Sequence, residues 1–259
     1  MKIGVGTFLK AALFSPAAYG LVTIVGLLVL LEATVQANLV SKWIVPLPTE
    51  VGSAIWELFV SDTIESALAS TTTAVAVCTA LVIAFGLPIG YLLYRYPKYG
   101  EAYGTLLKSL FSVPMILLFP VFLVMFGRNY VAIICCAFSH CVLPVIIYTH
   151  EALFGVPAVL LKVGKTFRVS NRDKFWKIML PHALPTIFVG IRLAMIYVLV
   201  YIVGIEYMIS FGGLGHLISD MYARFDIPKT FAAIVFVILL SGSLYFVMRG
   251  IEAWMRRLR

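Results

Sequence analysis

Charged residues are scarce in this chain. Only 12% of its 259 residues are Asp, Glu, Lys or Arg, whereas about a quarter of the residues in a typical soluble domain are charged. Hydrophobic residues make up 62% of the chain, and the mean hydropathy is +1.01. This composition excludes an ordinary soluble domain and predicts a protein of the lipid bilayer.

The common catalytic motifs are also missing. The sequence contains no G-x-x-x-x-G-K-[ST] phosphate loop, no H-E-x-x-H zinc motif and no G-x-S-x-G nucleophile motif. The stretch Gly212-Gly213-Leu214-Gly215 is rich in glycine but follows no predicted strand, so it does not indicate a nucleotide site. We therefore expect a chain that is not an enzyme, does not hydrolyse nucleotide by itself and carries no cofactor.

Cysteines are few, and none predicts a disulfide framework or a metal centre. Cys78, Cys135, Cys136 and Cys141 all fall within predicted membrane spans. Cys136 and His140 are one helical turn apart, a spacing at which soft ligands hold a thiophilic ion. However, Cys135 points about 100° away from Cys136 on a helix, and cysteine is an ordinary small apolar residue in packed helices. We predict no metal site.

Six runs of about 20 residues are nearly free of charge and predict six transmembrane helices. They cover residues 11–31, 67–94, 109–126, 130–149, 183–205 and 231–248. Without a low-complexity linker or a fixed-period repeat, the chain is expected to form one all-α membrane domain over residues 1–259. The first run also resembles a signal peptide, but it is longer than the usual signal core of about 7–15 residues. We expect it to be kept as a helix.

The distribution of Lys and Arg predicts the orientation. If the N-terminus is cytoplasmic, all but four of the 20 basic residues fall on the cytoplasmic side; the four are Lys42, Arg128, Arg224 and Lys229. This asymmetry satisfies the positive-inside rule with an even number of spans, so both termini are predicted to be cytoplasmic. Anionic lipid accounts for the net charge of +8 without any nucleic acid partner.

The segments outside the spans differ in length. In the external segment 35–66, residues 51–59 predict a short surface helix, whereas the cytoplasmic connection 94–108 is predicted to be short. Within the second span, Gly86 and Gly90 have the small-xxx-small spacing that permits close contact between helices.

The cytoplasmic segment 150–181 is the longest of these. It carries six basic residues against Glu151 and Asp173, and its apolar residues recur at helical spacing. The pattern predicts amphipathic helical pieces broken near residues 169–171, with Ser170 or Asn171 capping the second piece. Two interpretations stay open: a helix on the inner leaflet, or a docking element for a cytoplasmic partner.

Three ionisable residues fall inside or at the ends of predicted spans, and a charge within the bilayer costs about 2.5–3.5 kcal/mol or more unless paired. Fraying or snorkelling explains Glu32 and Arg192, which lie near span ends. Glu206 needs another explanation: it either lines a translocation path or anchors the following turn, residues 210–215.

Four stretches resemble the permease subunit of ATP-binding-cassette (ABC) importers of the nitrate, sulfonate, taurine, bicarbonate and thiamine-precursor branch. They are VPLPTEV at 45–51, SVPMILLFPVFLVMFG at 112–127, KIMLPHALPTIFVGIRLA at 177–194 and GIEYMISFGGLGHLI at 204–218. The third stretch is similar to the Leu-Pro-x-Ala-Leu-Pro passage of that family, and the fourth to its Glu and Gly-x-Gly turn.

The resemblance implies a type I ABC importer permease fold with a cytoplasmic coupling helix between the fourth and fifth spans. It implies two ATPase subunits that carry ATP and Mg²⁺, a second permease subunit in a homodimer or heterodimer, an external solute-binding protein and surrounding membrane lipid. It further implies a bacterial inner membrane location and a small solute of the nitrate, sulfonate, taurine or bicarbonate class.

The resemblance also assigns candidate residues. Contact with the ATPase falls on Lys162, Val163, Gly164, Lys165, Phe167, Arg168, Leu180 and Pro181. The translocation path or outer gate falls on Tyr201, Glu206, Gly212, Gly213 and Gly215. Because proline lacks an N–H and disfavours helix in the residue before it, Pro181 is expected to turn Leu180 out of helix. With Pro185 in the first turn of the fifth span, the passage is predicted to be a rigid corner.

The chain departs from the family in this loop. Counting back from Leu180-Pro181 places Lys162-Val163-Gly164 at the Glu-Ala-Ala positions of the family motif, and Arg168 at its glycine. A register with Gly164 as that glycine would need about four inserted residues, and no turn pattern supports them. Either the docking groove has compensating acidic residues, or this subunit pairs with an unlike permease.

Two alternative functions are an ion-coupled secondary carrier and a membrane-embedded enzyme. An ion-coupled secondary carrier would use Glu206 and His140, but such carriers usually show inverted repeats with paired broken helices, which the sequence lacks. A membrane-embedded enzyme would need a single site, whereas the histidines fall on both membrane sides; they are His140, His150, His182 and His216.

Overall fold

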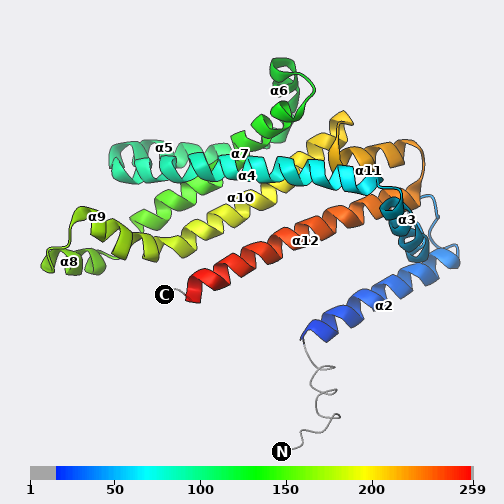
Figure 1. The fold of residues 1–259 in the computed structure, drawn as a ribbon, viewed down its shortest axis with the longest axis horizontal. Helices are drawn as coiled ribbons and strands as arrows, with labels where there is room; N and C mark the ends of the chain where they lie inside the picture. The colour runs from blue at the N-terminus through cyan, green and yellow to red at the C-terminus, as the bar shows by residue number, and fades with distance from the viewer. Residues whose placement is uncertain (1–15, 258–259) are drawn as a thin grey trace, which may run out of the picture.

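The computed structural model describes residues 16–257, and every regular element within that range is a helix (Figure 1). The predicted all-α class is thereby confirmed, while residues 11–15 of the first predicted span lie outside the described range. The helices are α2 Pro16–Gln36, α3 Pro48–Val60, α4 Thr63–Arg95, α5 Pro97–Phe111, η1 Met115–Leu118, α6 Phe119–Phe126, α7 Tyr130–Phe154, α8 Ala158–Thr166, α9 Asn171–Lys174, η2 Phe175–Met179, α10 Leu180–Ile209, α11 Gly213–Ala223 and α12 Ile227–Arg257.

Five helical segments of the described chain are long and apolar enough to cross a membrane, and the bent pair formed by α5 and η1–α6 makes a sixth. In Figure 1 the long helices α4, α7, α10 and α12 run along the longest axis of the molecule. Helix α7 lies at the centre and packs against both α4 and α10. Consequently α7 is the most buried of the candidate spans.

Glycines bring these helices close together. Added Cβ atoms at Gly86 and Gly90 would lie 2.7 and 2.6 Å from the Cβ atoms of Val145 and Thr149 in α7, and one at Gly190 in α10 would meet α7 from the other side. Such short contacts leave no room for a larger side chain. The contact predicted from the spacing of Gly86 and Gly90 is confirmed.

The stretch predicted as a third span, residues 109–126, is broken in the structure. Helix α5 ends at Phe111, and the chain bends by 79° before η1 and α6. Pro114 provides the physical reason, since it has no N–H to donate and disfavours helix at Val113. Residues 94–108 are not a short connection, because α5 begins at Pro97, a favourable first helical residue.

The corner predicted at Leu180-Pro181 is absent. Leu180 has helical angles (φ −60°, ψ −47°), and its N–H bonds to the carbonyl of Phe175, five residues earlier. The wider π-helical turn η2 gives the ring of Pro181 room and needs no N–H from it. The prediction of a rigid non-helical corner is therefore wrong, and Pro185 lies inside α10 rather than in its first turn.

Helix α2 stands apart from the bundle. Most of its apolar side chains are exposed, as at Val22 and Val29, and it makes its contacts mainly with α3. The carboxylate of Glu32 accepts hydrogen bonds from the N–H (3.2 Å) and the hydroxyl (2.9 Å) of Thr49 in the first turn of α3. A negative group is favourable at a helix N-terminus, so capping explains Glu32 better than fraying or snorkelling.

Helix α3 confirms the short helix predicted at residues 51–59, and it is tied to the bundle. Lys229 near the start of α12 lies 3.2 Å from the carboxylate of Glu57 in α3. Arg192, the basic residue inside α10, lies 3.6 Å from Glu252 of α12. That ion pair accounts for Arg192 without exposing its charge to lipid alone.

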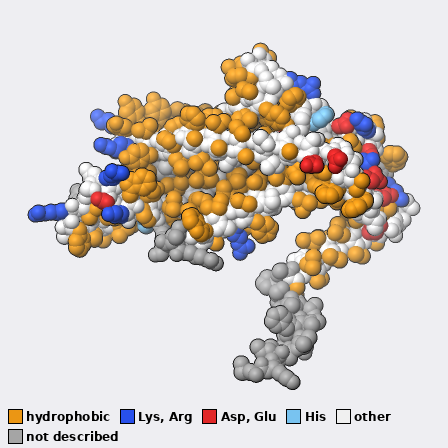
Figure 2. All heavy atoms as spheres, in the orientation of Figure 1, with side chains coloured by type: hydrophobic (Ala, Val, Ile, Leu, Met, Phe, Trp, Pro, Cys, Tyr) orange, Lys and Arg blue, Asp and Glu red, His pale blue; other side chains and the backbone are white. Residues whose placement is uncertain are grey.

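Charged side chains gather at the two ends of the molecule (Figure 2). Lys and Arg cluster around α8, α9 and the start of α5, whereas acidic side chains gather near α3 and α11. The surface between them is mostly apolar in this view, as expected of a membrane-facing belt.

Candidate functional site

The predicted functional residues fall in two places at opposite ends of α10 (Figure 1). One is the segment between α7 and α10, residues 155–179, which we call the basic loop. The other is the turn between α10 and α11, residues 210–213, together with the buried Glu206.

The basic loop contains two helical pieces, as predicted. Helix α8 ends at Thr166 and α9 begins at Asn171. Ser170 caps α9, because its hydroxyl oxygen accepts a hydrogen bond from the N–H of Asp173 at 3.1 Å and its O–H donates to the Asp173 carboxylate at 2.7 Å. The predicted break near residues 169–171 and the cap at Ser170 are confirmed.

Gly164 lies where α8 packs against η2. It is buried, and a Cβ added there would lie 2.9 Å from Cδ1 of Ile178 in η2. The neighbouring candidates face outward: Lys162 is exposed, as are Val163 and Phe167. The side chain of Lys165 lies outside the part that the structure describes. The loop therefore presents a mixed cationic and apolar surface with a glycine contact beneath it.

Arg168 has a left-handed backbone with φ +51°. Glycine adopts that conformation freely, whereas other residues adopt it at a cost. The count back from Leu180-Pro181 placed Arg168 at the glycine of the family motif, so the backbone supports that register. Arg168 thus combines a backbone conformation that favours glycine with a cationic side chain.

The basic loop is not neutralised by its own acids. Asp173 pairs with Lys177 at 2.8 Å within the loop. Among the described side chains, the other basic residues of the loop form no ion pair. These residues are Lys162, Arg168, Arg172 and Lys174. The surface therefore carries uncompensated positive charge.

At the other end of α10, Glu206 is completely buried. Its carboxylate accepts hydrogen bonds from the hydroxyl of Thr71 in α4 at 2.9 Å, from the N–H of Gly215 in α11 at 3.1 Å and from the hydroxyl of Tyr130 in α7 at 3.4 Å. The oxygen of Thr71 in turn accepts the N–H of Leu214 at 2.8 Å. We call these five residues the Glu206 network; it joins α4, α7, α10 and α11.

Glycine is required beside this carboxylate. Gly212 and Gly213 have positive φ angles of 55° and 65°. A Cβ on Gly213 would overlap the carboxylate of Glu206, and one on Gly215 would overlap the carbonyl oxygen of Val203. The predicted glycines therefore serve to bring the turn onto Glu206, and in this conformation the carboxylate anchors the turn and does not face an open path.

Three residues of this region were missed by the sequence analysis: Thr71, Tyr130 and Arg128. The guanidinium of Arg128 donates to the carbonyl of Ser210 and lies 5.8 Å from the ring centre of Phe211. A threonine in an apolar helix carries no periodic or charge signal, so Thr71 could be found only from the fold.

Tyr201 does not join the glycine turn. Its ring stacks on His140 with centroids 4.9 Å apart, and His140 also stacks on Phe111 at 5.0 Å. This cluster lies where α5 ends before the 79° bend. Among the described residues, no group of three or more His, Cys, Asp or Glu side chains is placed to hold a metal ion.

Comparison with known proteins decides the family. The model of the binding-protein-dependent transport system inner membrane component matches residues 83–257, a range that includes the basic loop and most of the Glu206 network. This chain belongs to that family. The family resemblance seen in the sequence is confirmed. The family is a component of transport systems and not a family of enzymes.

Individual relatives agree. This permease is 30% identical over 199 residues to the putative aliphatic sulfonates transport permease protein SsuC of Bacillus subtilis, covering 76% of this chain and 72% of that protein. It is 29% identical over 167 residues to the glycine betaine/proline betaine permease protein ProW of Escherichia coli, covering 64% of this chain. The match spans about half of ProW, 47%. The nitrate import permease protein NrtB of Synechococcus elongatus is 26% identical over 184 residues, covering 71% of this chain and 66% of NrtB.

The fold has a counterpart among solved structures. An inward-facing conformation of the MetNI methionine ABC transporter superposes with a TM-score of 0.64 at 19% identity. The match covers 74% of this chain and 95% of the other. The predicted ABC importer permease fold is confirmed.

Proposed function

We propose that this chain is the membrane-spanning subunit of an ATP-driven importer that moves a small solute inward after an external binding protein delivers it. Family membership supports the role, and relatives named for sulfonates, nitrate and bicarbonate support a small solute of the nitrate, sulfonate, taurine or bicarbonate class. ATP and Mg²⁺ belong to a separate ATPase subunit, because this sequence has no phosphate loop.

The observation that carries the proposal is the surface of the basic loop. It combines exposed cations with the exposed ring of Phe167, and Arg168 has the left-handed backbone that favours glycine. Apolar anchors ringed by unpaired charge are typical of a docking surface. The ATPase groove that receives this loop is therefore acidic, which is the first of the two explanations offered for the departure from the family motif.

The helical path into the membrane supports a mechanical coupling. From Asn171 the chain runs through η2 into α10 with helical geometry as far as Ile209. A rotation of the docked loop therefore turns α10 as a rigid body. Glu206 near the far end of α10 is bonded to α4, α7 and α11, so the motion reaches the glycine turn. Glu206 and the glycines Gly212, Gly213 and Gly215 are accordingly assigned to the outer gate, and Tyr201, which stacks on His140, is assigned to the translocation path.

The assembly follows from the same role. Two ATPase subunits grip two permease subunits, which are two copies of this chain or this chain and an unlike partner. The complex lies in a bacterial inner membrane with both termini of this chain in the cytoplasm. The gathering of Lys and Arg around the basic loop (Figure 2) supports that orientation.

Reconstituted uptake tests the function. Proteoliposomes would contain the purified permease with and without its ATPase subunit, and would receive binding protein loaded with a radiolabelled sulfonate, nitrate or bicarbonate. Uptake is expected only when the ATPase subunit and ATP are both present. Uptake driven by an ion gradient without the ATPase subunit would contradict the proposal and favour a secondary carrier.

A further inference from the structure

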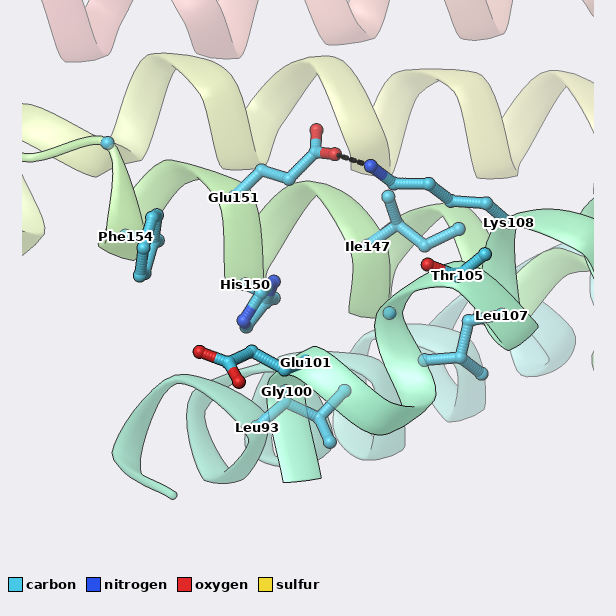
Figure 3. Close-up of a pocket in the computed structure, with 12 residues that line it drawn as sticks. Leu93, Gly100, Glu101, Thr105, Leu107, Lys108, Ile147, His150, Glu151 and Phe154 are labelled. Atoms are coloured by element: carbon cyan, nitrogen blue, oxygen red, sulfur yellow. Dashed lines mark ion pairs between the residues drawn. The ribbon is translucent and has the colours of Figure 1, made fainter. Parts of the chain in front are cut away.

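A cavity of about 380 Å³ lies between α5 and α7, close to the basic loop (Figure 3). Its polar lining comes from both helices: Glu101, Thr105 and Lys108 from α5, and His150 and Glu151 from α7. None of these residues belongs to the Glu206 network or to the predicted docking surface, so the cavity needs an explanation of its own.

Two glycines of α5 shape the cavity. A Cβ at Gly100 would lie 2.7 Å from Nε2 of His150, so the helices touch there. One helical turn later, a Cβ at Gly104 would have no atom within 4 Å. The helices therefore meet at Gly100 and leave open space at Gly104. That space is present because the residue at 104 has no side chain.

The charges of the lining are unequal. Lys108 and Glu151 form an ion pair at 2.7 Å. Glu101 is exposed and forms no ion pair among the described side chains; Figure 3 shows it on the α5 side of the cavity, below His150. With two acids, one base and a neutral imidazole, the lining has a formal charge of −1. A ligand with a cationic end is favoured beside Glu101, while Lys108 and the hydroxyl of Thr105 are donors for a second, anionic group.

Tyrosines beside the cavity indicate that it lies at the depth of lipid headgroups. Tyr96, which precedes α5, and Tyr99 and Tyr103 of α5 form an exposed row with successive ring centres 6.3 Å apart. Exposed tyrosines are enriched at the interface between membrane and water. Apolar side chains, including Leu107 and Ile147, line the rest of the cavity. A ligand that is polar at one end and apolar at the other suits this combination.

We propose that the cavity binds the headgroup of a zwitterionic aminophospholipid of the phosphatidylethanolamine type. The ammonium donates to Glu101, and the phosphate accepts from Lys108 and Thr105. Glu101 and Lys108 are seven residues apart, which is about 10 Å along a helix. A headgroup held between their two side chains bridges that separation. The inference concerns lipid recognition and does not depend on transport.

The charge pattern distinguishes this lipid from its neighbours in a bilayer. The trimethylated ammonium of phosphatidylcholine has no N–H to donate to a carboxylate. Phosphatidylglycerol has no cation and meets a lining with net negative charge. Phosphatidylethanolamine has both an ammonium that donates to Glu101 and a phosphate that accepts from Lys108 and Thr105.

The test uses the purified full-length chain in nanodiscs with equal amounts of the three lipids, and native mass spectrometry to count those retained. Glu101→Gln removes the anionic acceptor, and Gly104→Leu fills the cavity with a residue that favours helix. Matched controls are Glu65→Gln, an exposed acid in α4, and Gly52→Leu, an open glycine in α3. The wild type is expected to retain phosphatidylethanolamine about tenfold over phosphatidylcholine, as for one charged hydrogen bond.

Both cavity variants are expected to lose this preference, and both controls to keep it. Equal retention of the three lipids by the wild type would overturn the proposal, as would a preference for phosphatidylglycerol. Unchanged retention in both Glu101→Gln and Gly104→Leu would show that the lipid binds elsewhere. Displacement of the lipid by soluble O-phosphoethanolamine at equal concentration would overturn the assignment to a lipid.

Discussion

The hydroxyl of Thr71 in α4 lies 2.9 Å from the carboxylate of Glu206 in α10, so one buried hydrogen bond joins two residues 135 positions apart in the sequence. The same hydroxyl oxygen accepts the N–H of Leu214. Thr71 therefore links a buried acid to the first turn of α11. We expect these two hydrogen bonds of Thr71 to make the glycine turn move together with α10.

Thr71→Val tests the link, because valine has the shape of threonine without its hydroxyl. We expect the variant to be less stable by about 2 kcal/mol, since a buried carboxylate and a backbone N–H both lose a partner. Thermal unfolding in detergent measures the change. Thr72→Val is the matched control, as Thr72 is exposed on the same helix; equal stability of the two variants would contradict the role of Thr71.

Gly213→Ala addresses the turn itself. Its φ of +65° and the overlap of an added Cβ with the Glu206 carboxylate both oppose alanine. We expect a loss of at least about 2 kcal/mol, seen as a lower yield of monodisperse protein by size-exclusion chromatography. Gly52→Ala, where the added Cβ meets nothing within 4 Å, should behave like the wild type. A normal yield for Gly213→Ala would mean that the turn is not held against Glu206.

Arg168→Gly separates backbone shape from charge. Glycine relieves the left-handed conformation, worth about 1 kcal/mol, so we expect slower hydrogen exchange in α8. Association with the ATPase subunit should weaken in the same variant because a cation is lost. Arg168→Lys keeps both the positive charge and the cost of a left-handed backbone. It should therefore change neither hydrogen exchange in α8 nor association with the ATPase subunit by much. Faster exchange in Arg168→Gly would contradict the assignment of strain to this position.

Charge reversal of the basic loop tests its partner. The double variant Lys162→Glu and Arg168→Glu should reduce co-purification of the ATPase subunit by about tenfold or more, as expected when paired charges at an interface become like charges. High salt should weaken the wild-type complex in the same direction. Lys98→Glu, which changes an exposed base on α5, is the control.

A second measurement separates the two interpretations of the basic loop. If the loop lies on the inner leaflet, the double variant lowers binding to anionic vesicles and leaves ATPase stoichiometry unchanged. Restoration of the complex by a basic substitution in the acidic groove of the ATPase would support direct docking.

Gly90→Ala probes the packing of α4 on α7. A Cβ at this position would lie 2.6 Å from Cβ of Thr149 and 2.7 Å from the carbonyl oxygen of Ile146, so the helices would have to separate. We expect a loss of about 2 kcal/mol in unfolding experiments. Gly250→Ala in α12, where the added Cβ has open space, should not lose stability.

Local signals in the sequence were sufficient for much of the fold. Long apolar runs located the spans because bilayer thickness sets their length, and Ser170 marked the start of α9 because its side chain satisfies a free N–H. The spacing of Gly86 and Gly90 identified a helix contact, and the structure adds that the partner is α7.

Features that depend on neighbours in space were not accessible. The break before Pro114 was missed because the uncharged run that defined the third predicted span, residues 109–126, continues across it. Pro181 predicted a corner, but the π-helical turn before it keeps the chain helical. For Glu206, the sequence left a path and an anchored turn as alternatives; its partners Thr71 and Tyr130 come from other helices and have no pattern that links them to it.

The isolation of α2 has a consequence for how the molecule can vary. Lipid surrounds a helix that touches the bundle so little, and lipid selects for apolar character rather than for a particular shape. In the part of the chain that the structure describes, Glu32 ties α2 to the bundle by capping α3. The family match also begins only at residue 83, inside α4. Helix α2 is thus best regarded as an accessory that the membrane holds in place, with fewer packing constraints on its side chains than the helices around α7 have.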